Sequence, residues 1–337
     1  MKILLVRADG IGDALACAPL LAALHAAGHT VGAVLGTKNR TIFAPDALLA
    51  VHVLERIAWP AHGSTPSSYG AALAGARALR YDAALVASEE PEAFAFAREA
   101  GIASRIGFIN GWEKPLKSLA VRASLTRAIV RPASARRVRE HEVRTLFRLG
   151  DGLVHEREPT RDRERLRAMV LGTDAARATT PCAGRDGRAS IVIQASAKFA
   201  AFGLNRAAFV ALARRLRANS RDIVVCGDDA EFARAIADES GARAECGLDL
   251  TGWKELIAGA RALVTPDSGA AHVAGMLGIA TVDAFAPGPA TAYDARRWTP
   301  WAAPYRVVTL DPSRAAEGIA ALLASALDDV LACGYAA

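Results

Sequence analysis

The stretch Val264-Thr-Pro-Asp-Ser-Gly-Ala-Ala-His-Val-Ala-Gly275 decides how the chain is expected to fold. It reads as the end of a buried strand, a Pro-Asp-Ser-Gly turn and a helix of small residues. A helix N-terminus leaves backbone N–H groups without intrahelical partners, so this turn favours an anion such as a diphosphate. The alternative is a capped helix with a packed histidine. The residues of the predicted anion site are Asp267, Ser268, Gly269, Ala270 and His272.

A second turn of the same kind, Arg7-Ala-Asp-Gly-Ile-Gly-Asp13, follows the first apolar run of the chain. We expect Gly10 and Gly12 to let the backbone bend sharply and approach a ligand closely. Asp13 then stands at the start of a helix, above the carboxyl end of the first strand. An Asp at such a position is most often an N-cap, which is the alternative to a functional carboxylate. We expect the two turns to face each other across one cleft.

Short apolar runs rich in Val, Ile and Leu alternate with helical patterns along the chain. This alternation is typical of parallel strands that helices bury on both faces. It predicts an α/β fold of two Rossmann-like halves, with ligands outside the carboxyl ends of the strands. The predicted strands are 3–6, 31–35, 51–54, 83–87, 105–107, 191–194, 223–226, 263–265, 280–285 and 307–310. The predicted helices are 14–26, 69–79, 93–100, 137–149, 206–218, 231–239, 254–259, 270–277 and 314–331.

The same pattern divides the chain into four parts. Residues 1–155 form an N-terminal domain, and residues 189–312 form a C-terminal domain. Between them, residues 156–188 hold many charges, a Thr-Thr-Pro and Gly184-Arg-Asp-Gly187, so we interpret them as a helix and an interdomain linker. The last part, 313–337, contains a helix long and amphipathic enough to pack back across both halves.

The composition is that of an ordinary globular protein with a basic surface. Its 337 residues carry a formal net charge of +6, which favours polyanions over a neutral partner, although a solvated basic surface is the alternative. The 5 cysteines are scattered without a C-x-x-C, so neither a disulfide framework nor a zinc site is indicated. The N-terminal apolar run is too short for a signal peptide, and no run reaches membrane-spanning length. We therefore expect a cytoplasmic protein that can touch the inner face of a membrane.

Two further loops end strands of the second half. Gln194-Ala-Ser-Ala-Lys198 offers hydroxyl, amide and ammonium groups, and Cys226-Gly-Asp-Asp-Ala-Glu231 offers carboxylates for ribose hydroxyls. The adjacent Asp228 and Asp229 point in different directions and have no third ligand, so no metal is expected. A dinucleotide fingerprint is weak because Leu15 stands where a small residue is needed. No G-x-S-x-G elbow supports a serine hydrolase.

Taken together, the motifs resemble those of glycosyltransferase family 9, the ADP-heptose:lipopolysaccharide heptosyltransferases, over nearly the whole chain. Four motifs in order carry the resemblance. They are Ile3-Leu-Leu-Val-Arg-Ala-Asp-Gly-Ile-Gly-Asp13 followed by Pro19, His141-Glu-Val before a helix ending in Leu149-Gly150, Asp249-Leu-Thr-Gly252, and Val264-Thr-Pro-Asp-Ser-Gly-Ala-Ala-His272.

The resemblance implies a GT-B architecture, in which the N-terminal domain binds the acceptor and the C-terminal domain binds the nucleotide sugar. It also implies a metal-independent, inverting displacement without a cofactor. Asp13 matches the family's catalytic aspartate, which accepts the proton of the acceptor hydroxyl as that oxygen attacks the anomeric carbon. The 267–272 turn then stabilises the leaving diphosphate.

The resemblance extends to further donor contacts, with one departure. Many members carry a Lys shortly followed by Trp-Pro before the helix at 206–218, whereas this chain has Phe202-Gly-Leu204 there. Lys198 is the candidate for the phosphate-binding role, and Glu231 matches an acidic residue on the ribose or base. The donor contacts predicted outside the 267–272 turn are Ser196, Lys198, Gly227 and Glu231.

Basic residues accumulate between 112 and 148. The family's acceptor is the phosphorylated, Kdo-bearing inner core of lipid A. The planar guanidinium of Arg can donate two parallel hydrogen bonds to a phosphate or carboxylate of such an acceptor. A solvated helix face is the alternative, and DNA is a poorer partner because no helix-turn-helix or zinc pattern accompanies the charge. The predicted acceptor contacts are Gly10, Gly12, Lys117, Arg122, Arg136 and Arg137.

The sequence thus predicts an inverting transferase that moves a heptose from ADP-heptose, or a similar nucleotide sugar, to the lipopolysaccharide inner core. Two alternatives stay open: a nucleotide-sugar-binding protein without catalysis, and a dinucleotide-dependent oxidoreductase. The exact donor sugar, the accepting hydroxyl and the oligomeric state are open at this point.

Overall fold

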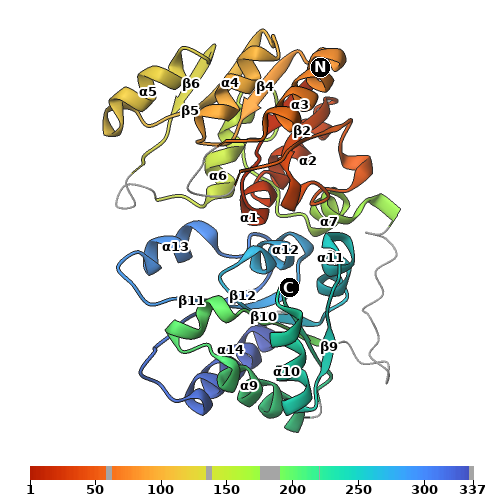
Figure 1. Ribbon diagram of the computed structural model, residues 1–337, viewed down its shortest axis with the longest axis vertical. Helices are drawn as coiled ribbons and strands as arrows, with labels where there is room; N and C mark the ends of the chain where they lie inside the picture. The colour runs from red at the N-terminus through yellow and green to blue at the C-terminus, as the bar shows by residue number, and fades with distance from the viewer. Residues whose placement is uncertain (58–62, 134–138, 175–189, 220, 334–337) are drawn as a thin grey trace. The chain divides into compact units, whose positions relative to one another are not determined.

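The computed structural model describes residues 1–57, 63–133, 139–174, 190–219 and 221–333. The chain splits into two compact units, Met1–Thr173 and Asp174–Ala337. Each unit is built on one six-stranded sheet flanked by helices (Figure 1). The division falls after helix α7 (Arg163–Leu171), which packs on α2 (Ala18–Ala26) in the first unit. The remainder of the predicted linker, from residue 175, lies outside the described residues.

The first sheet is parallel, with the order β3-β2-β1-β4-β5-β6. Its strands are β1 (Lys2–Val6), β2 (Thr30–Gly36), β3 (Val51–Leu54), β4 (Ala83–Val86), β5 (Ser104–Ile109) and β6 (Arg127–Val130). Strands β1 to β3 follow one another towards one edge of the sheet, and strands β4 to β6 follow one another towards the other edge. The gap between β1 and β4 is therefore the topological switch point, where ligands of such sheets bind.

Proline begins several helices of this unit, because the first turn of a helix does not need its missing N–H. The remaining helices are α1 (Ile11–Leu15), α3 (Pro66–Leu79), α4 (Pro91–Glu99), α5 (Pro115–Arg122) and α6 (Glu142–Phe147). The helix predicted at 14–26 is in fact two helices, α1 and α2. Pro19 explains the break, since it cannot donate a hydrogen bond to the carbonyl of Leu15.

The second sheet repeats the topology of the first, with the order β12-β11-β10-β7-β8-β9. Its strands are β7 (Ile191–Gln194), β8 (Ile223–Cys226), β9 (Arg243–Glu245), β10 (Ala262–Pro266), β11 (Ala280–Phe285) and β12 (Tyr305–Thr309). All pairs are parallel, and the switch point lies between β7 and β10. The prediction of two Rossmann-like halves is confirmed, and the architecture is that of the GT-B fold.

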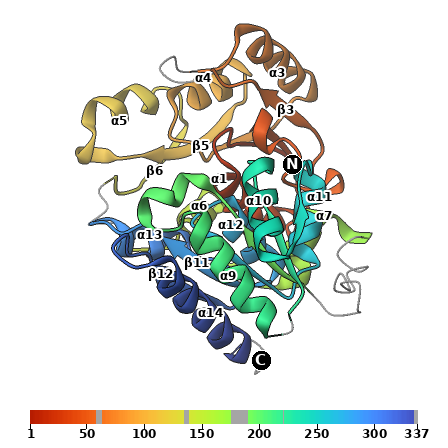
Figure 2. The same ribbon diagram turned by 60° about the horizontal axis from the view of Figure 1, so that its bottom comes forward.

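The helices of the second unit are α9 (Arg206–Ala218), α10 (Ala230–Ser240), α11 (Leu250–Ala258), α12 (Gly269–Leu277), α13 (Thr291–Trp298) and α14 (Ala316–Cys333). Helix α14 lies along α9 and packs on β10, β11 and β12 (Figure 2). That α14 also packs on the first half stays a prediction. Among the described residues, no helix combines the length and apolar character needed to cross a membrane.

Candidate functional site

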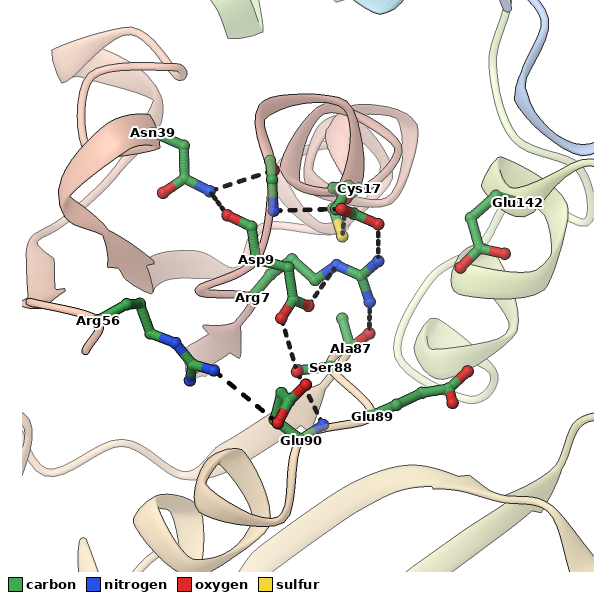
Figure 3. Close-up of polar contacts among 12 residues, drawn as sticks. Arg7, Asp9, Cys17, Asn39, Arg56, Ala87, Ser88, Glu89, Glu90 and Glu142 are labelled. Atoms are coloured by element: carbon green, nitrogen blue, oxygen red, sulfur yellow. Dashed lines mark hydrogen bonds and ion pairs between the residues drawn. The ribbon is translucent and has the colours of Figure 1, made fainter. Parts of the chain in front are cut away.

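Arg7 follows β1 directly and is buried, with only 4% of its surface exposed. Its Nη2 lies 2.6 Å from Asp13 Oδ1, and its Nε lies 3.2 Å from Asp9 Oδ2 (Figure 3). The guanidinium also donates to the carbonyl oxygen of Ala87, which follows β4. Burial lowers the pKa of Arg7, but Asp13 and Asp9 raise it by more, so the side chain stays a cation. Arg7 therefore links the carboxyl ends of β1 and β4, the two strands at the switch point of the first sheet.

Asp13 is the third residue of α1 and not its N-cap, which is Gly10. Its Oδ2 accepts a hydrogen bond from the Gly10 N–H at 3.1 Å, while its Oδ1 pairs with Arg7. A Cβ on Gly10 would lie 2.9 Å from Asp13 Oδ2. The backbone at Gly10 is extended (φ −72°) and Gly12 lies within the helix, so neither residue adopts a conformation that only glycine favours. What Gly10 supplies is room for the Asp13 carboxylate.

Side chains from neighbouring loops hold this turn. Asn39, buried after β2, donates from Nδ2 to the carbonyl oxygens of Asp9 (2.9 Å) and Gly10 (3.3 Å). Ser88, after β4, donates from Oγ to Asp9 Oδ1 at 3.3 Å. Burial raises the pKa of the Asp9 carboxyl, although Arg7 lowers it. Residues that follow β1, β2 and β4 thus meet at this turn, as Figure 3 shows for Asp9, Asn39 and Ser88.

A second buried cation, Arg131, follows β6. Its Nη2 lies 2.9 Å from Glu89 Oε1 and its Nη1 lies 3.2 Å from Glu142 Oε1. Its guanidinium also stacks over the Phe108 ring at 5.5 Å from the centroid. Glu142 is fully buried at the start of α6, whose N-cap His141 accepts at Nδ1 from a backbone N–H. Glu89 and Glu142 appear in the same close-up as Arg7 (Figure 3), and the charge of Glu142 helps to raise the pKa of Arg7.

A pocket of about 270 Å³ opens beside Arg131. Its volume is close to the lower end of the range for small-ligand sites. The side chains of three arginines and two glutamates line it, and one of those glutamates pairs with Arg131, so the pocket favours an anion. The lining residues are Arg131, Pro132, Arg139, Glu140, Glu142, Thr145 and Arg148.

The predicted acceptor contacts are only partly gathered here. Lys117 Nζ lies 3.7 Å from Glu89 Oε2, so it belongs to the Arg131 cluster. Arg122 donates from Nη1 to the Leu125 carbonyl at 2.9 Å and so closes the end of its own helix. Arg136 and Arg137 lie outside the described residues. Arg7 and Arg131 were not predicted as site residues. For Arg7 the sequence offered a signal, since it directly follows the predicted strand 3–6. For Arg131 it offered none, because β6, which precedes it, was not predicted.

In the second unit, Ser268 is the N-cap of α12. Its Oγ accepts from the Ala270 N–H at 3.3 Å and lies 3.0 Å from Thr265 Oγ1. The backbone N–H of Asp267 donates to the Ala284 carbonyl at 2.9 Å. Burial, and then Asp294, raises the pKa of Asp267 to about 6. The predicted turn and helix start, including Gly269 and Ala270 in the first turn of α12, are in place.

His272 lies in α12 with its ring against the edge of Trp298 in α13, at 5.5 Å between centroids. The Arg297 guanidinium lies 4.8 Å from the Trp298 ring centroid. Contact between His272 and a ligand at the turn stays a prediction.

Asp283 on β11 is a buried carboxyl that was not predicted as a site residue. Both of its oxygens are buried without a hydrogen-bond partner. Its backbone pairs with Thr265, two residues before Asp267. Burial, and then Asp267, raises the pKa of Asp283 well above its ordinary value. A buried acidic group with a raised pKa therefore lies beside the strand that leads into the turn.

The loops after β7 and β8 lie in close backbone contact. A Cβ on Gly227 would meet the Ala195 carbonyl oxygen at 2.6 Å, so glycine is needed for this approach. Ser196 is buried at the start of the 3-10 turn η5 (Ala197–Phe202). Gln194 Oε1 accepts from the Trp253 indole N–H at 2.9 Å. These contacts place Ser196 and Gly227 next to the switch point of the second sheet.

The charged donor contacts are more exposed. Lys198 Nζ lies 3.3 Å from Asp228 Oδ2 on the surface. Asp229 is the N-cap of α10, and Glu231 is exposed in the first turn of that helix. Within the part of the chain that the structure describes, no group of three or more His, Cys, Asp or Glu side chains is placed to hold a metal ion.

Comparisons with known proteins concern the family and the fold of the chain. The sequence model of glycosyltransferase family 9 (heptosyltransferase) matches residues 73–318. A search of curated proteins finds no match. The Escherichia coli ADP-heptose lipopolysaccharide heptosyltransferase II structure superposes with a TM-score of 0.65 at 19% identity, covering 96% of this chain and 99% of that one. E. coli heptosyltransferase WaaC with ADP gives a TM-score of 0.74 at 17% identity, covering 98% and 100%. WaaC with ADP-2-deoxy-2-fluoro heptose gives 0.73 at 18%, covering 96% and 99%.

Structural likeness at this identity shows the fold, and the family match extends over well more than half of the chain. The order of the four sequence motifs, the paired six-stranded sheets and the family match agree. The chain belongs to glycosyltransferase family 9, the heptosyltransferase family, and is a glycosyltransferase.

Proposed function

We propose that this enzyme transfers a heptose from ADP-heptose to the acidic inner core of lipopolysaccharide by a metal-independent, inverting displacement. The observation that carries the proposal is the Asp13 carboxylate, which Arg7 and the Gly10 N–H hold at the carboxyl end of β1. About a third of the Asp13 side chain (34%) is exposed, so a substrate hydroxyl can reach it. A positioned carboxylate is a common general base for a poorly nucleophilic hydroxyl.

The proposed reaction has one displacement step. Asp13 accepts the proton of the acceptor hydroxyl while that oxygen forms a bond to the anomeric carbon of the heptose. The bond between that carbon and the β-phosphate oxygen breaks, and ADP leaves from the opposite face. In this scheme Arg7 holds the Asp13 carboxylate in position and does not itself contact the substrate.

The donor would be held by the second unit. Two WaaC structures contain ADP or a fluorinated ADP-heptose. These ligands of a similar protein support our proposal that the present enzyme also takes a nucleotide-sugar donor. We place the diphosphate at the N–H groups of Gly269 and Ala270, where the dipole of α12 favours negative charge and the phosphate would replace Ser268 Oγ as the acceptor of the Ala270 N–H. Lys198 would add a cation once the phosphate competes for it with Asp228. Ser196, Gly227 and Glu231 would line the nucleoside side.

The acceptor would be held by the first unit. The pocket beside Arg131 offers the guanidinium groups of Arg139 and Arg148 to a phosphate or sugar carboxylate. Glu142 lines the pocket and also acts on Arg7, so an anion bound there would lie near the base. We propose that Lys117 and the pocket arginines select an acidic core sugar.

The test compares Asp13→Asn with Asp151→Asn, which removes an exposed carboxylate of the same unit. Asp13→Asn should lower transfer by about 10²- to 10⁴-fold, the usual contribution of a general base. Both variants should keep the ADP-induced stabilisation of about 2.7 kcal/mol at a hundredfold excess over Kd. Full turnover by Asp13→Asn would overturn the mechanism. Donor binding by the wild type without transfer to any acidic core would instead favour a binding protein.

A further inference from the structure

Helix α5 and the turn before it expose apolar side chains on the face directed away from the sheet. Trp112 is 95% exposed, Leu116 84% and Leu119 74%, the highest values among the large apolar residues of the described chain. The inward face of the same helix already buries Ser118 and Val121. A surface helix normally places polar residues outward, whereas α5 exposes Leu116 and Leu119 to water.

We call the exposed apolar side chains Trp112, Leu116 and Leu119 the α5 face. Leu116 and Leu119 are three positions apart and therefore neighbours on the helix surface, and Ala120 and Ala123 of the same segment are also exposed. Trp112 belongs to the 3-10 turn η3 (Gly111–Glu113). In both views α5 lies at the outer edge of the first unit, beside β5 and β6 (Figures 1 and 2).

The turn that carries Trp112 is fixed in place. Gly111 has a φ of +57°, a conformation that glycine adopts without strain. Ser118 Oγ donates to the Gly111 carbonyl at 3.1 Å, which joins the turn to α5. Glu113 turns its carboxylate to the Ala133 N–H at 2.8 Å. The indole is therefore presented by an ordered turn.

Two exposed cations flank the α5 face. Lys114 lies between Trp112 and Leu116 in the chain, and Arg122 lies three positions after Leu119. The other basic residues between 111 and 131 have acidic partners, since Lys117 and Arg131 pair with Glu89 and Arg127 pairs with Asp151. The one acid in this range, Glu113, accepts a hydrogen bond from a backbone N–H. An apolar face beside exposed cations suits an apolar partner that carries negative charge at its surface.

We propose that the α5 face docks on the surface of an anionic lipid bilayer. Trp is enriched at membrane interfaces, and short helices with Trp and Leu beside Lys and Arg lie in the interfacial plane. Anionic headgroups attract each flanking cation. A second copy of the chain is a poorer occupant, because a two-fold contact would bring Lys114 and Arg122 of both copies together. This inference does not depend on the transfer reaction.

The test is flotation of the full chain with vesicles of phosphatidylglycerol and phosphatidylethanolamine. The wild type should float with these vesicles and much less with pure phosphatidylcholine or at high salt. Leu116→Glu and Leu119→Glu should each lower the partition coefficient by about tenfold or more, as loss of a buried leucine implies. Leu49→Glu, at a 42% exposed leucine of the same unit, is the matched control and should bind as the wild type does.

Two further measurements decide between outcomes. The first is the melting temperature, which should be the same for all variants and the wild type because the changed side chains already face water. The second is flotation of Trp112→Ala, which tests the same face without adding a charge. Absence of wild-type binding to anionic vesicles, or unchanged binding of Leu116→Glu and Leu119→Glu, would overturn the proposal. So would a wild-type dimer in sedimentation that Leu116→Glu converts to monomer, since the face would then join two copies.

Discussion

Replacing Arg7 by Met should destabilise the first unit and remove the support of Asp13 in a single step. Methionine keeps much of the buried aliphatic stem, so the change isolates the loss of the guanidinium. That group lies 2.6 Å from Asp13 and 3.2 Å from Asp9, and it also satisfies the Ala87 carbonyl. Its removal leaves two carboxylates side by side without their shared cation.

The expected magnitude follows from burial. Removing one partner of a fully buried ion pair costs about 3–5 kcal/mol. The Asp9 and Asp13 side chains are 23% and 34% exposed, so water replaces part of the lost interaction. We therefore expect a loss of about 3 kcal/mol. In a unit of this size, that loss lowers the melting temperature by roughly 6–12 °C.

The loss should depend on pH. Burial raises the pKa of Asp9, and Arg7 opposes that rise, so the pKa of Asp9 in the variant should stand higher still. A carboxyl whose pKa is higher folded than unfolded binds more protons when folded, and it therefore costs stability as pH rises above its unfolded value. The destabilisation should be largest near neutral pH and should shrink as pH falls towards about 4.

Scanning calorimetry at pH ~5 and ~7.5 would measure these effects for Arg7→Met, Asp13→Asn and the double variant. The double variant should be more stable than the sum of the single losses predicts, since the amide that replaces the Asp13 carboxylate carries no charge to leave unpaired. Arg127→Met removes an exposed partner of Asp151 and should cost less than about 0.5 kcal/mol. The reasoning is refuted if Arg7→Met melts within about 2 °C of the wild type at neutral pH.

Three further predictions concern the second unit and one glycine control. Burial raises the pKa of Asp283, and a carboxyl with a raised folded pKa costs stability as pH rises above its unfolded pKa. Asp283→Asn should therefore resist urea better than the wild type at pH ~7.5 and equally well below pH ~4. A variant less stable than the wild type at pH ~7.5 would contradict this. Gly227→Ala should cost about 1–3 kcal/mol in the same assay because its Cβ would meet the Ala195 carbonyl, whereas Gly70→Ala, in open space on α3, should gain about 0.5–1 kcal/mol. Asp267, with its pKa of about 6, gains charge as pH rises and should then oppose a diphosphate at the turn. Calorimetric titration should show ADP binding weakening roughly three- to tenfold from pH ~5 to ~7.5, and a flat profile for Asp267→Asn; the same slope in both proteins would count against the placement.

Much of the fold was predictable because the central strands are uniformly apolar. Ile191–Gln194 and Ile223–Cys226 are completely buried, and their limits match the prediction. The strands that escaped prediction, β6 and β9, lie at sheet edges. An edge strand faces water on one side, so the residues of Arg127–Val130 and Arg243–Glu245 mix charge with small apolar groups and give no apolar run.

The site was predictable only where chemistry is local in sequence. The turn at 267–269 follows from its own residues, since Ser268 caps the helix that begins one position later. Arg7 was not predictable as the partner of Asp13, because its burial depends on Ala87, eighty positions away. Arg131 likewise needs Glu89 and Glu142, which three different segments bring together.

The two sheets also explain why the motifs stand where they do. Read from opposite edges, they have the same strand order, so β7 corresponds to β1 and β10 corresponds to β4. The Asp13 turn follows β1, whereas the Ser268 turn follows β10, so each motif uses a different member of the pair that borders its switch point. The other member then supplies the neighbouring loop. In the first sheet this loop carries Ser88, which holds Asp9, and in the second sheet it carries Ser196. Strand order, which no local motif encodes, is what places each of these two serines beside its motif.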